Sequence, residues 1–420
     1  MNNTIQQQKI PDISDIIGRT KKLTSEISDH VSGAELQEQI GQIYLAQPET
    51  FRSSLRRFLH DSLRQMEPQD ASDMDIGGPG CAGKIWYRIH GEKKPVSNNT
   101  PLPHITTDFL CQALLTGRQR ALLLEGKNVD FSYSLPSLNG KASQRFRADM
   151  YFDLGHLALN VRRISSEIRP FKSLGFHPAV AQLLSVDYQS SGLILVTGIS
   201  GAGKSSTLDT IIDANNRTAN THIVIIASPV ELVHTPQKAI IRHREVGRDV
   251  RSFKSGTVEA LRQDPDIIVI GELRDPETII TALEVADSGH KTFSTLHTAS
   301  AIESIDRIVA ETPPTEQDRV RHRLADVLTV VISQKLIRDK AGKPVLAKEV
   351  LVNNSSVRAA IQNNNTNDIY QILQEGSESG MHTLEQDLKR LVDQGTIEAK
   401  TAISHANNKK RMRQLLQYLD

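Results

Sequence analysis

The sequence predicts an α/β fold in which a parallel sheet is preceded by a smaller α+β domain, with helical extensions at both ends of the chain. Two observations support this prediction. Four short apolar runs alternate with helical stretches between residues 193 and 296, which is the pattern of a parallel sheet. Directly after the first run, residues 198–205 match the pattern G-x-x-x-x-G-K-[ST] at every fixed position, and a helical stretch follows.

Length and composition exclude several classes of protein. A chain of 420 residues suggests two or three domains. The 50 Lys and Arg nearly cancel the 49 Asp and Glu, so the basic excess of a dedicated nucleic-acid binder is missing. Two cysteines are too few for a disulfide framework or a four-cysteine zinc site. Without a segment like a signal peptide or a membrane span, we expect a cytoplasmic protein with no specific nucleic-acid partner.

The chain divides into five predicted parts. Residues 1–68 show apolar stripes at helical spacing and are expected to form a helical extension. Residues 69–166 are rich in strand signals and are expected to form the α+β domain. Residues 167–180 are interpreted as a linker, residues 181–345 as the α/β core, and residues 346–420 as a helical C-terminal region.

Apolar periodicity places the expected elements within these parts. In the α+β domain we expect a helix at residues 106–115 and strands at 84–90, 129–133 and 157–161. In the core we expect helices at 255–262 and 277–286 and strands at 193–196, 223–226, 267–270 and 292–296. A start resembling a capping box at residues 315–318 predicts one more helix, whose apolar positions continue from Val320 to Val331.

The glycine-rich loop, placed between a strand and a helix, predicts a site for the phosphates of a nucleoside triphosphate. Glycines let successive backbone N–H groups curl around phosphates, and the helix N-terminus adds the positive end of its dipole. Lys204 is expected to reach the β- and γ-phosphates, and the Ser205 hydroxyl is expected to ligate Mg²⁺. The residues expected to bind the nucleotide are Gly198, Ser200, Gly201, Ala202, Gly203, Lys204, Ser205 and Ser206.

A carboxylate follows the third apolar run of the core. Residues 267–270 end in Gly271 and Glu272, about 70 residues after the phosphate loop. Ligands of open α/β sheets bind at the carboxyl ends of the strands, and a carboxylate there can polarise the attacking water or hold Mg²⁺. An apolar run ending in Glu is a weak signal alone, but at this distance from a phosphate loop it indicates a Walker B motif.

Two further motifs accompany the phosphate loop, which is a Walker A motif, and the Walker B motif. Residues 226–234 form an Asp box, and residues 289–301 form a His box. With the Walker A and Walker B motifs, they make the chain resemble the type II/type IV secretion ATPase superfamily, above all its PilT-type pilus retraction motors. The resemblance covers residues 69–400, and the first 68 residues have no counterpart in it.

The resemblance implies a RecA-like P-loop NTPase domain preceded by a PAS-like domain, assembled as a homohexamer that binds ATP and Mg²⁺ between these domains. It implies that Glu231 and Glu272, together with the phosphate-loop serine, act on the metal, and that both glutamates act on the attacking water. It implies that His297 contacts or senses the nucleotide. Arg147 and Arg162 match the places where the PAS-like domain holds arginines that reach the γ-phosphate.

The function implied is an ATP-hydrolysing motor that powers type IV pilus retraction or twitching motility at an inner-membrane platform protein. Ala227 and Ser228 replace two acids of the usual Asp box. A Ser before the proline is closer to type IVB secretion or conjugation ATPases of the DotB/TraJ kind, although these keep the preceding Glu. The loss of these two acids leaves open the alternative that the chain is a weakly active regulatory paralogue of the retraction motor. A nucleic-acid translocase is disfavoured by the Asp and His boxes. The basic residues 409–413 leave peripheral association with the cytoplasmic face of the inner membrane as an alternative.

Overall fold

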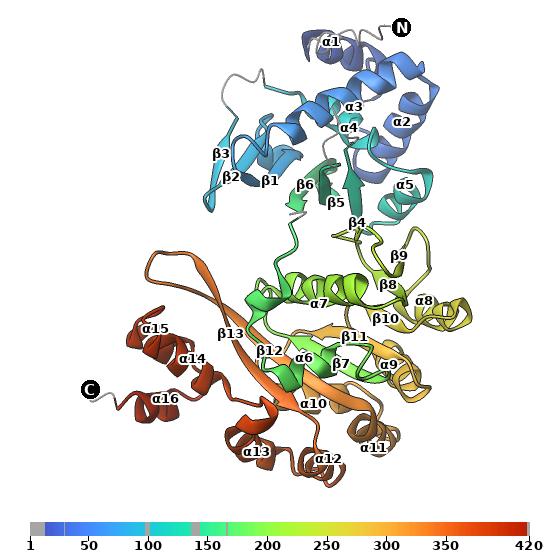
Figure 1. The fold of residues 1–420 in the computed structure, drawn as a ribbon. Coiled ribbons are helices and arrows are strands. Elements are labelled where there is room, and N and C mark those ends of the chain that lie inside the picture. The colour runs from blue at the N-terminus through green and yellow to red at the C-terminus, as the bar shows by residue number, and fades with distance from the viewer. Residues whose placement is uncertain (1–12, 29, 97–100, 136–142, 165–166, 418–420) are drawn as a thin grey trace, which may run out of the picture. The chain divides into compact units, whose positions relative to one another are not determined.

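The computed structural model describes residues 13–28, 30–96, 101–135, 143–164 and 167–417 (Figure 1). The chain separates into two compact units, Met1–Ser166 and Glu167–Asp420. Each unit has its own sheet and its own hydrophobic core, so each is described by itself.

The first unit contains a six-stranded antiparallel sheet with the strand order β3-β2-β1-β6-β5-β4. Its strands are β1 (Ala71–Gly77), β2 (Trp86–Ile89), β3 (Glu92–Pro95), β4 (Val129–Ser134), β5 (Arg145–Asp153) and β6 (His156–Ile164). Its helices are α1 (Ile13–Leu23), α2 (Gly33–Ala46), α3 (Glu49–Arg64), α4 (His104–Gln112) and α5 (Gly117–Leu124).

One face of this sheet is apolar and packs against helices. Met74 lies opposite Val161, and Val161 lies opposite Ala148, on three neighbouring strands. These side chains share one core with Leu55 of α3 and Phe109 of α4. The helices of the first 68 residues therefore bury their apolar stripes on the same core as the sheet that follows them.

The second unit contains a seven-stranded sheet with the strand order β13-β12-β7-β11-β10-β8-β9. Its strands are β7 (Gly192–Thr197), β8 (His222–Ala227), β9 (Ile240–Glu245), β10 (Ile267–Ile270), β11 (Lys291–Leu296), β12 (Leu328–Arg338) and β13 (Pro344–Val352). Only the β12–β13 pair is antiparallel, and the remaining neighbours are parallel. The four strands predicted from apolar runs, now β7, β8, β10 and β11, are confirmed.

Helices cover both faces of this sheet, which explains why its central strands read as continuous apolar runs. Along β7, Leu193 and Leu195 belong to one core, and Ile194 and Val196 belong to the other. The helices up to α11 are α6 (Pro178–Leu184), α7 (Lys204–Thr218), α8 (Phe253–Ala260), α9 (Pro276–Asp287), α10 (Ala301–Ala310) and α11 (Gln317–Val327). The helices predicted at 255–262 and 277–286 correspond to α8 and α9.

The helix predicted to continue to Val331 is wrong in two respects. Helix α11 begins after Glu316, whose side chain makes no capping hydrogen bond, so the expected capping box does not form. The helix ends at Val327, and Val331 lies on β12, opposite Leu195 of β7. The apolar spacing continues across this junction because the helix and the strand are buried in the same core, and pairing with β7 decides which structure forms.

The region predicted to be helical from residue 346 begins instead with the rest of strand β13, which ends at Val352, and helices follow this strand. It contains α12 (Ser355–Gln362), α13 (Ile369–Glu375), α14 (Leu384–Asp393), α15 (Ala399–His405) and α16 (Lys409–Leu416). Ile337 and Ala347 of the β12–β13 pair share a small core with Leu388, Ala402 and Met412 of the last three helices. Among the residues that the structure describes, no helix is both long enough and apolar enough to cross a membrane.

Candidate active site

Four sequence motifs meet at one edge of the second sheet. β7 leads into the phosphate loop, β8 into the Asp box, β10 into Gly271 and Glu272, and β11 into His297. These four strands are neighbours in the order β7-β11-β10-β8 and run parallel, so their carboxyl ends lie side by side. The sheet thereby brings together motifs that are separated by up to about 100 residues in the sequence.

The phosphate loop has the backbone that its glycines allow. Gly198 has φ +152°, and a Cβ there would lie 2.5 Å from the carbonyl oxygen of Gln334. Gly203 is left-handed, with φ +83°, and is the N-cap of α7. From the other side, Nε2 of Gln334 donates to the Ala202 carbonyl at 2.7 Å. The loop is fixed against β12, while Ser200, Gly201, Ser205 and Ser206 are exposed.

Lys204 begins α7 and folds over the loop that precedes it. Its Nζ donates to the carbonyls of Gly198 at 2.8 Å and Ile199 at 3.3 Å, and lies 3.4 Å from Nδ1 of His297. Burial lowers the pKa of Lys204, and the negative charge of Glu272 opposes that effect. These carbonyls lie next to the N-terminus of α7, where a phosphate would bind. The ammonium group can therefore exchange its carbonyl acceptors for phosphate oxygens.

Glu272 and His297 form the second part of the site. Only 14% of the Glu272 side chain is exposed; one of its oxygens pairs with Arg274, and the other lies 3.8 Å from Nε2 of His297. Burial lowers the pKa of His297, the charge of Lys204 lowers it further, and Glu272 opposes both. The imidazole therefore favours its neutral form, although 46% of its side chain is exposed.

The Asp box leaves β8 at the same edge. Glu231 is half-buried, and so are Ala227 and Ser228, which stand where the related motif has acids. The backbone of this segment is tied down by Glu245, a buried residue of β9 whose carboxylate accepts from the Val230 N–H at 3.0 Å. The Asp box thus starts at the edge where the phosphate loop lies, and Glu231 follows four residues after the end of β8.

The residues at this edge fit a magnesium ion by their chemistry. Mg²⁺ takes oxygen ligands, commonly one or two carboxylates together with phosphate oxygens and water. Ser205 supplies an exposed hydroxyl on the first turn of α7, and Glu231 and Glu272 supply carboxylates at the ends of neighbouring strands. These donors are the expected type.

Two supporting residues escaped the sequence-based prediction. Arg307 of α10 donates to the carbonyl of His297 at 3.0 Å, and Arg274 pairs with Glu272. Arg274 lies two residues beyond Glu272, so its position in the Walker B region was a usable signal. No local pattern pointed to Arg307, because its contact depends on how α10 turns back along the loop.

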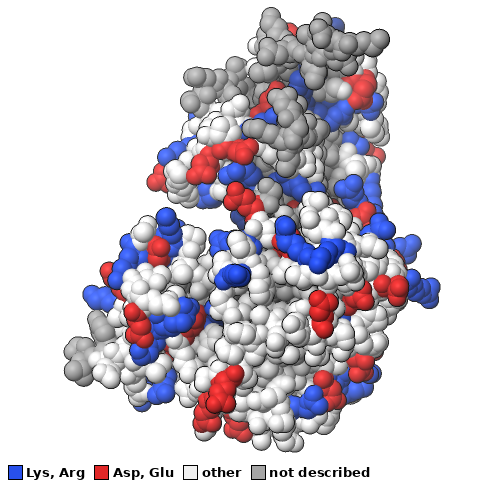
Figure 2. All heavy atoms as spheres, in the orientation of Figure 1, with Lys and Arg blue, Asp and Glu red and all other residues white. Residues whose placement is uncertain are grey.

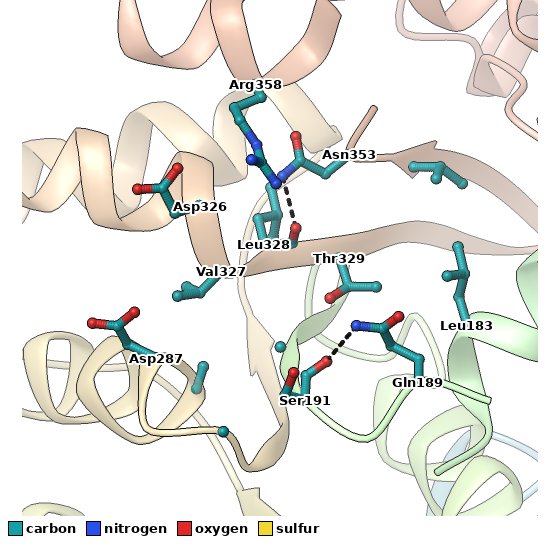
Figure 3. A pocket seen from close by; sticks show the side chains of 14 residues that line it. Leu183, Gln189, Ser191, Asp287, Asp326, Val327, Leu328, Thr329, Asn353 and Arg358 are labelled. Carbon is teal, nitrogen blue, oxygen red and sulfur yellow. Dashed lines mark hydrogen bonds between the residues drawn. The ribbon is translucent and has the colours of Figure 1, made fainter. Parts of the chain in front are cut away.

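A cavity lies at the opposite edge of the sheet (Figure 3). Its volume is about 400 Å³, and its lining includes Ser191 and Gly192 before or at the start of β7 and Leu328 at the start of β12. These are the amino ends of the strands. His290 also lies at this end, preceding β11, with Nδ1 2.9 Å from the Ser288 hydroxyl. His290 is therefore separated from His297 by the full length of β11.

Arg147 and Arg162 lie on the charged face of the sheet in the first unit. They are direct cross-strand partners on β5 and β6. Nε of Arg147 donates to Asp130 at 3.1 Å, and Nε of Arg162 donates to Asp73 at 2.9 Å. Burial opposes ionisation of Asp73, but hydrogen bonds from Ser72 and Arg162 outweigh it and lower its pKa.

The same cross-strand register extends over all six strands. Its members, in spatial order from β3 to β4, are Lys93, Arg88, Asp73, Arg162, Arg147 and Ser132. All six residues are polar or charged, and the apolar residues that alternate with them along the strands pack on the helical side. Figure 2 shows basic and acidic side chains interspersed over the visible surface of the described residues, without one continuous basic face.

A glycine loop at a helix N-terminus, with carboxylates and a histidine at the ends of adjacent parallel strands, defines a P-loop nucleoside triphosphatase. Comparison with known proteins gives the family. The model for type II/IV secretion system proteins matches residues 116–417. The chain belongs to this family.

Individual relatives agree with the family assignment. The type IV pilus retraction ATPase PilT of Pseudomonas aeruginosa is 36% identical over 334 residues, covering 80% of this chain and 94% of PilT. The twitching motility protein of Neisseria gonorrhoeae is 36% identical over 355 residues, covering 84% of this chain and 91% of that protein.

Solved structures agree as well. A crystal structure of the pilus retraction motor PilT with bound ADP matches with a TM-score of 0.74 and 35% identity, covering 84% of this chain and 98% of that one. The ATPase DotB of Legionella pneumophila matches with a TM-score of 0.67 at 24% identity, covering 84% of this chain and 96% of DotB, and this likeness supports the fold alone. The predicted RecA-like fold class is confirmed.

Proposed function

We propose that this chain is an ATP-hydrolysing motor that powers type IV pilus retraction or twitching motility. The observation that carries the proposal is the meeting of the phosphate loop, Glu231, Glu272 and His297 at one edge of four adjacent parallel strands. The relatives named for twitching motility and pilus retraction support the process. The resemblance further suggests a cytoplasmic homohexamer that acts on an inner-membrane platform protein, with its PAS-like domain within residues 69–166.

Each residue at the edge has a proposed part in hydrolysis. The backbone N–H groups of residues 198–206 surround the phosphates, and Lys204 places a positive charge on the β- and γ-phosphates. Mg²⁺, when bound, would neutralise phosphate charge, held by Ser205, Glu231 and Glu272. Both glutamates also orient the attacking water, and Glu231 accepts the one proton that it releases. Neutral His297 can accept a hydrogen bond from that water or from Lys204.

Positive charge on the γ-phosphate is proposed to come from Arg147 and Arg162. They are neighbours on the charged sheet face, and each pairs with an acid whose place a phosphate could take. Arginine to alanine at either position should lower kcat about a hundredfold to a thousandfold and leave ADP affinity unchanged, because ADP lacks the γ-phosphate.

Arg163→Ala is the matched control for these substitutions. Arg163 is next to Arg162 in sequence, but its Nε donates to the Ala71 carbonyl at 3.2 Å. Steady-state ATP hydrolysis and ADP titration on the full chain provide the measurement. A loss in Arg163→Ala equal to that in Arg147→Ala and Arg162→Ala would remove the proposed role of these two residues.

The activity itself is tested by Mg-ATP hydrolysis of the wild type beside Glu231→Gln. We expect wild-type turnover and a loss of about a hundredfold in the variant, because glutamine cannot accept the proton of the attacking water. No wild-type turnover with ATP still bound would instead support a regulatory paralogue, in which the acids absent at Ala227 and Ser228 are essential.

A type IVB secretion or conjugation ATPase is the second candidate, favoured by one observation. Ser228 precedes Pro229 in the Asp box, as in DotB-like sequences, although these keep a Glu at the position of Ala227. Deleting the gene and scoring twitching motility and conjugative transfer side by side separates the two candidates. Loss of twitching alone supports retraction, and loss of transfer alone supports type IVB secretion.

A further inference from the structure

The loop that carries His297 is held mainly by side chains. Residues 297–300 connect β11 to α10. Arg307 donates to the His297 carbonyl at 3.0 Å, and the Ala299 N–H donates to Glu303 at 2.7 Å. Arg307 and Glu303 both lie on α10, the helix that directly follows the loop.

A third contact to this loop comes from the far end of the chain. Asn407 lies between α15 and α16, and its Nδ2 donates to the Ala299 carbonyl at 3.1 Å. Its Oδ1 accepts from Nζ of Lys335 at 2.7 Å, and Lys335 also donates to the His405 carbonyl at 2.9 Å. The amide thus uses its donor on the His297 loop and its acceptor on β12.

Two buried carboxylates lie near this bridge, and they accept backbone hydrogen bonds at the start of α10 and just before α16. Glu349 of β13 accepts from the Ala301 N–H at 2.8 Å, and Glu385 of α14 accepts from the Asn408 N–H at 2.7 Å. Burial raises the pKa of Glu349 to about 7, and the nearby charge of Glu385 adds to that rise while Lys335 opposes it. The loop, the strands and the C-terminal helices therefore meet in one polar network.

We propose that Asn407 is a positioning residue for His297. Its amide, fixed by Lys335, holds the Ala299 carbonyl two residues beyond the histidine. This contact keeps the imidazole 3.4 Å from Lys204 and 3.8 Å from Glu272. The inference rests on the proposed part of His297 in hydrolysis. It also makes the C-terminal helices a route by which a partner bound there changes the rate at the phosphate loop.

Asn407→Ala and Asn407→Asp test the proposal by different chemistry. Alanine loses both contacts, whereas aspartate keeps an acceptor for Lys335 but cannot donate to the Ala299 carbonyl. In steady-state hydrolysis by the full chain, both should lower kcat about threefold to tenfold, the factor that corresponds to one lost hydrogen bond, and leave KM for ATP unchanged.

A double-mutant cycle supplies a readout that a loss of folding would not move. If Asn407 acts through His297, Asn407→Ala should lower kcat in the wild type but cause no further loss in a His297→Ala background. An equal further loss in that background would separate Asn407 from His297.

Asn408→Ala is the matched control, because Asn408 caps α16 through the Arg411 N–H at 2.9 Å and its side chain is not part of the bridge. Unchanged kcat in Asn408→Ala, with lowered kcat in both Asn407 variants, supports the proposal. An equal loss in Asn408→Ala overturns it, since disturbance of α16 then suffices. If His297→Ala lowers kcat but the Asn407 variants do not, the bridge alone is overturned. If His297→Ala has no effect, the proposed part of His297 fails, and the bridge with it.

Discussion

Lys204→Ala is expected to reduce ATP hydrolysis by about a hundredfold to a thousandfold, the range seen when a preorganised electrostatic donor is removed. The Lys204 ammonium lies 2.8 Å from the Gly198 carbonyl, inside the loop that would hold the phosphates. Alanine removes the charge without replacing the donors that now satisfy the carbonyls of Gly198 and Ile199. Nucleotide affinity should fall together with kcat. Steady-state hydrolysis and titration with a fluorescent ATP analogue measure both effects.

The control for this substitution is Lys254→Ala. Lys254 is half-exposed and pairs with Glu277 at 3.1 Å on the surface, where an ion pair contributes little. Its replacement should leave kcat and affinity within twofold, roughly the spread expected of a surface substitution. Hydrolysis by Lys204→Ala at more than a tenth of the wild-type rate would contradict the placement of this lysine at the transferred phosphate.

Glu272→Gln is expected to stop turnover while ATP stays bound. Glutamine keeps the size of the side chain and an acceptor oxygen but loses the negative charge, so kcat should fall about a hundredfold to a thousandfold. A second effect follows from the pKa values. Glu272 now opposes the lowering of the pKa of both Lys204 and His297, so its neutralisation should lower both further.

The measurement is a single-turnover experiment that follows bound ATP and released phosphate. Glu277→Gln is the matched control, because Glu277 lies five residues away on the first turn of α9 and is mostly exposed. We expect Glu277→Gln to turn over like the wild type. Phosphate release by Glu272→Gln at the wild-type rate would rule out this carboxylate as a catalytic group.

Much of the core could be predicted because its strands are buried on both faces. Such strands appear in the sequence as unbroken apolar runs, as in residues 267–270. The edge strand β9 was missed because it has one neighbour only, and Arg242, His243 and Arg244 interrupt its apolar pattern. In the first unit, β5 alternates charged and apolar residues, and its charges hid the strand.

The candidate site could be predicted to the extent that each motif is contiguous in sequence. The conformation of a phosphate loop follows from its own contiguous residues. The parallel sheet then brings the segments that carry Glu231, Glu272 and His297 to the same edge. The supporting contacts are long-range and left no local signal. Asn407 is 108 residues from Ala299, and Gln334 is 132 residues from Ala202. Contacts of this kind depend on how β12 and the C-terminal helices pack, which periodicity does not reveal.

The β12–β13 pair has a mechanical consequence. β12 pairs with β7 only as far as Ser333, whereas its pairing with β13 continues to Arg338. The two strands therefore extend beyond β7 as a two-stranded ribbon about 17 Å long at about 3.4 Å per residue. Gln334 joins its base to the phosphate loop, and α14 to α16 pack along it. The ribbon is a lever, because a rotation of about 10° at its base moves its far end by about 3 Å over that length.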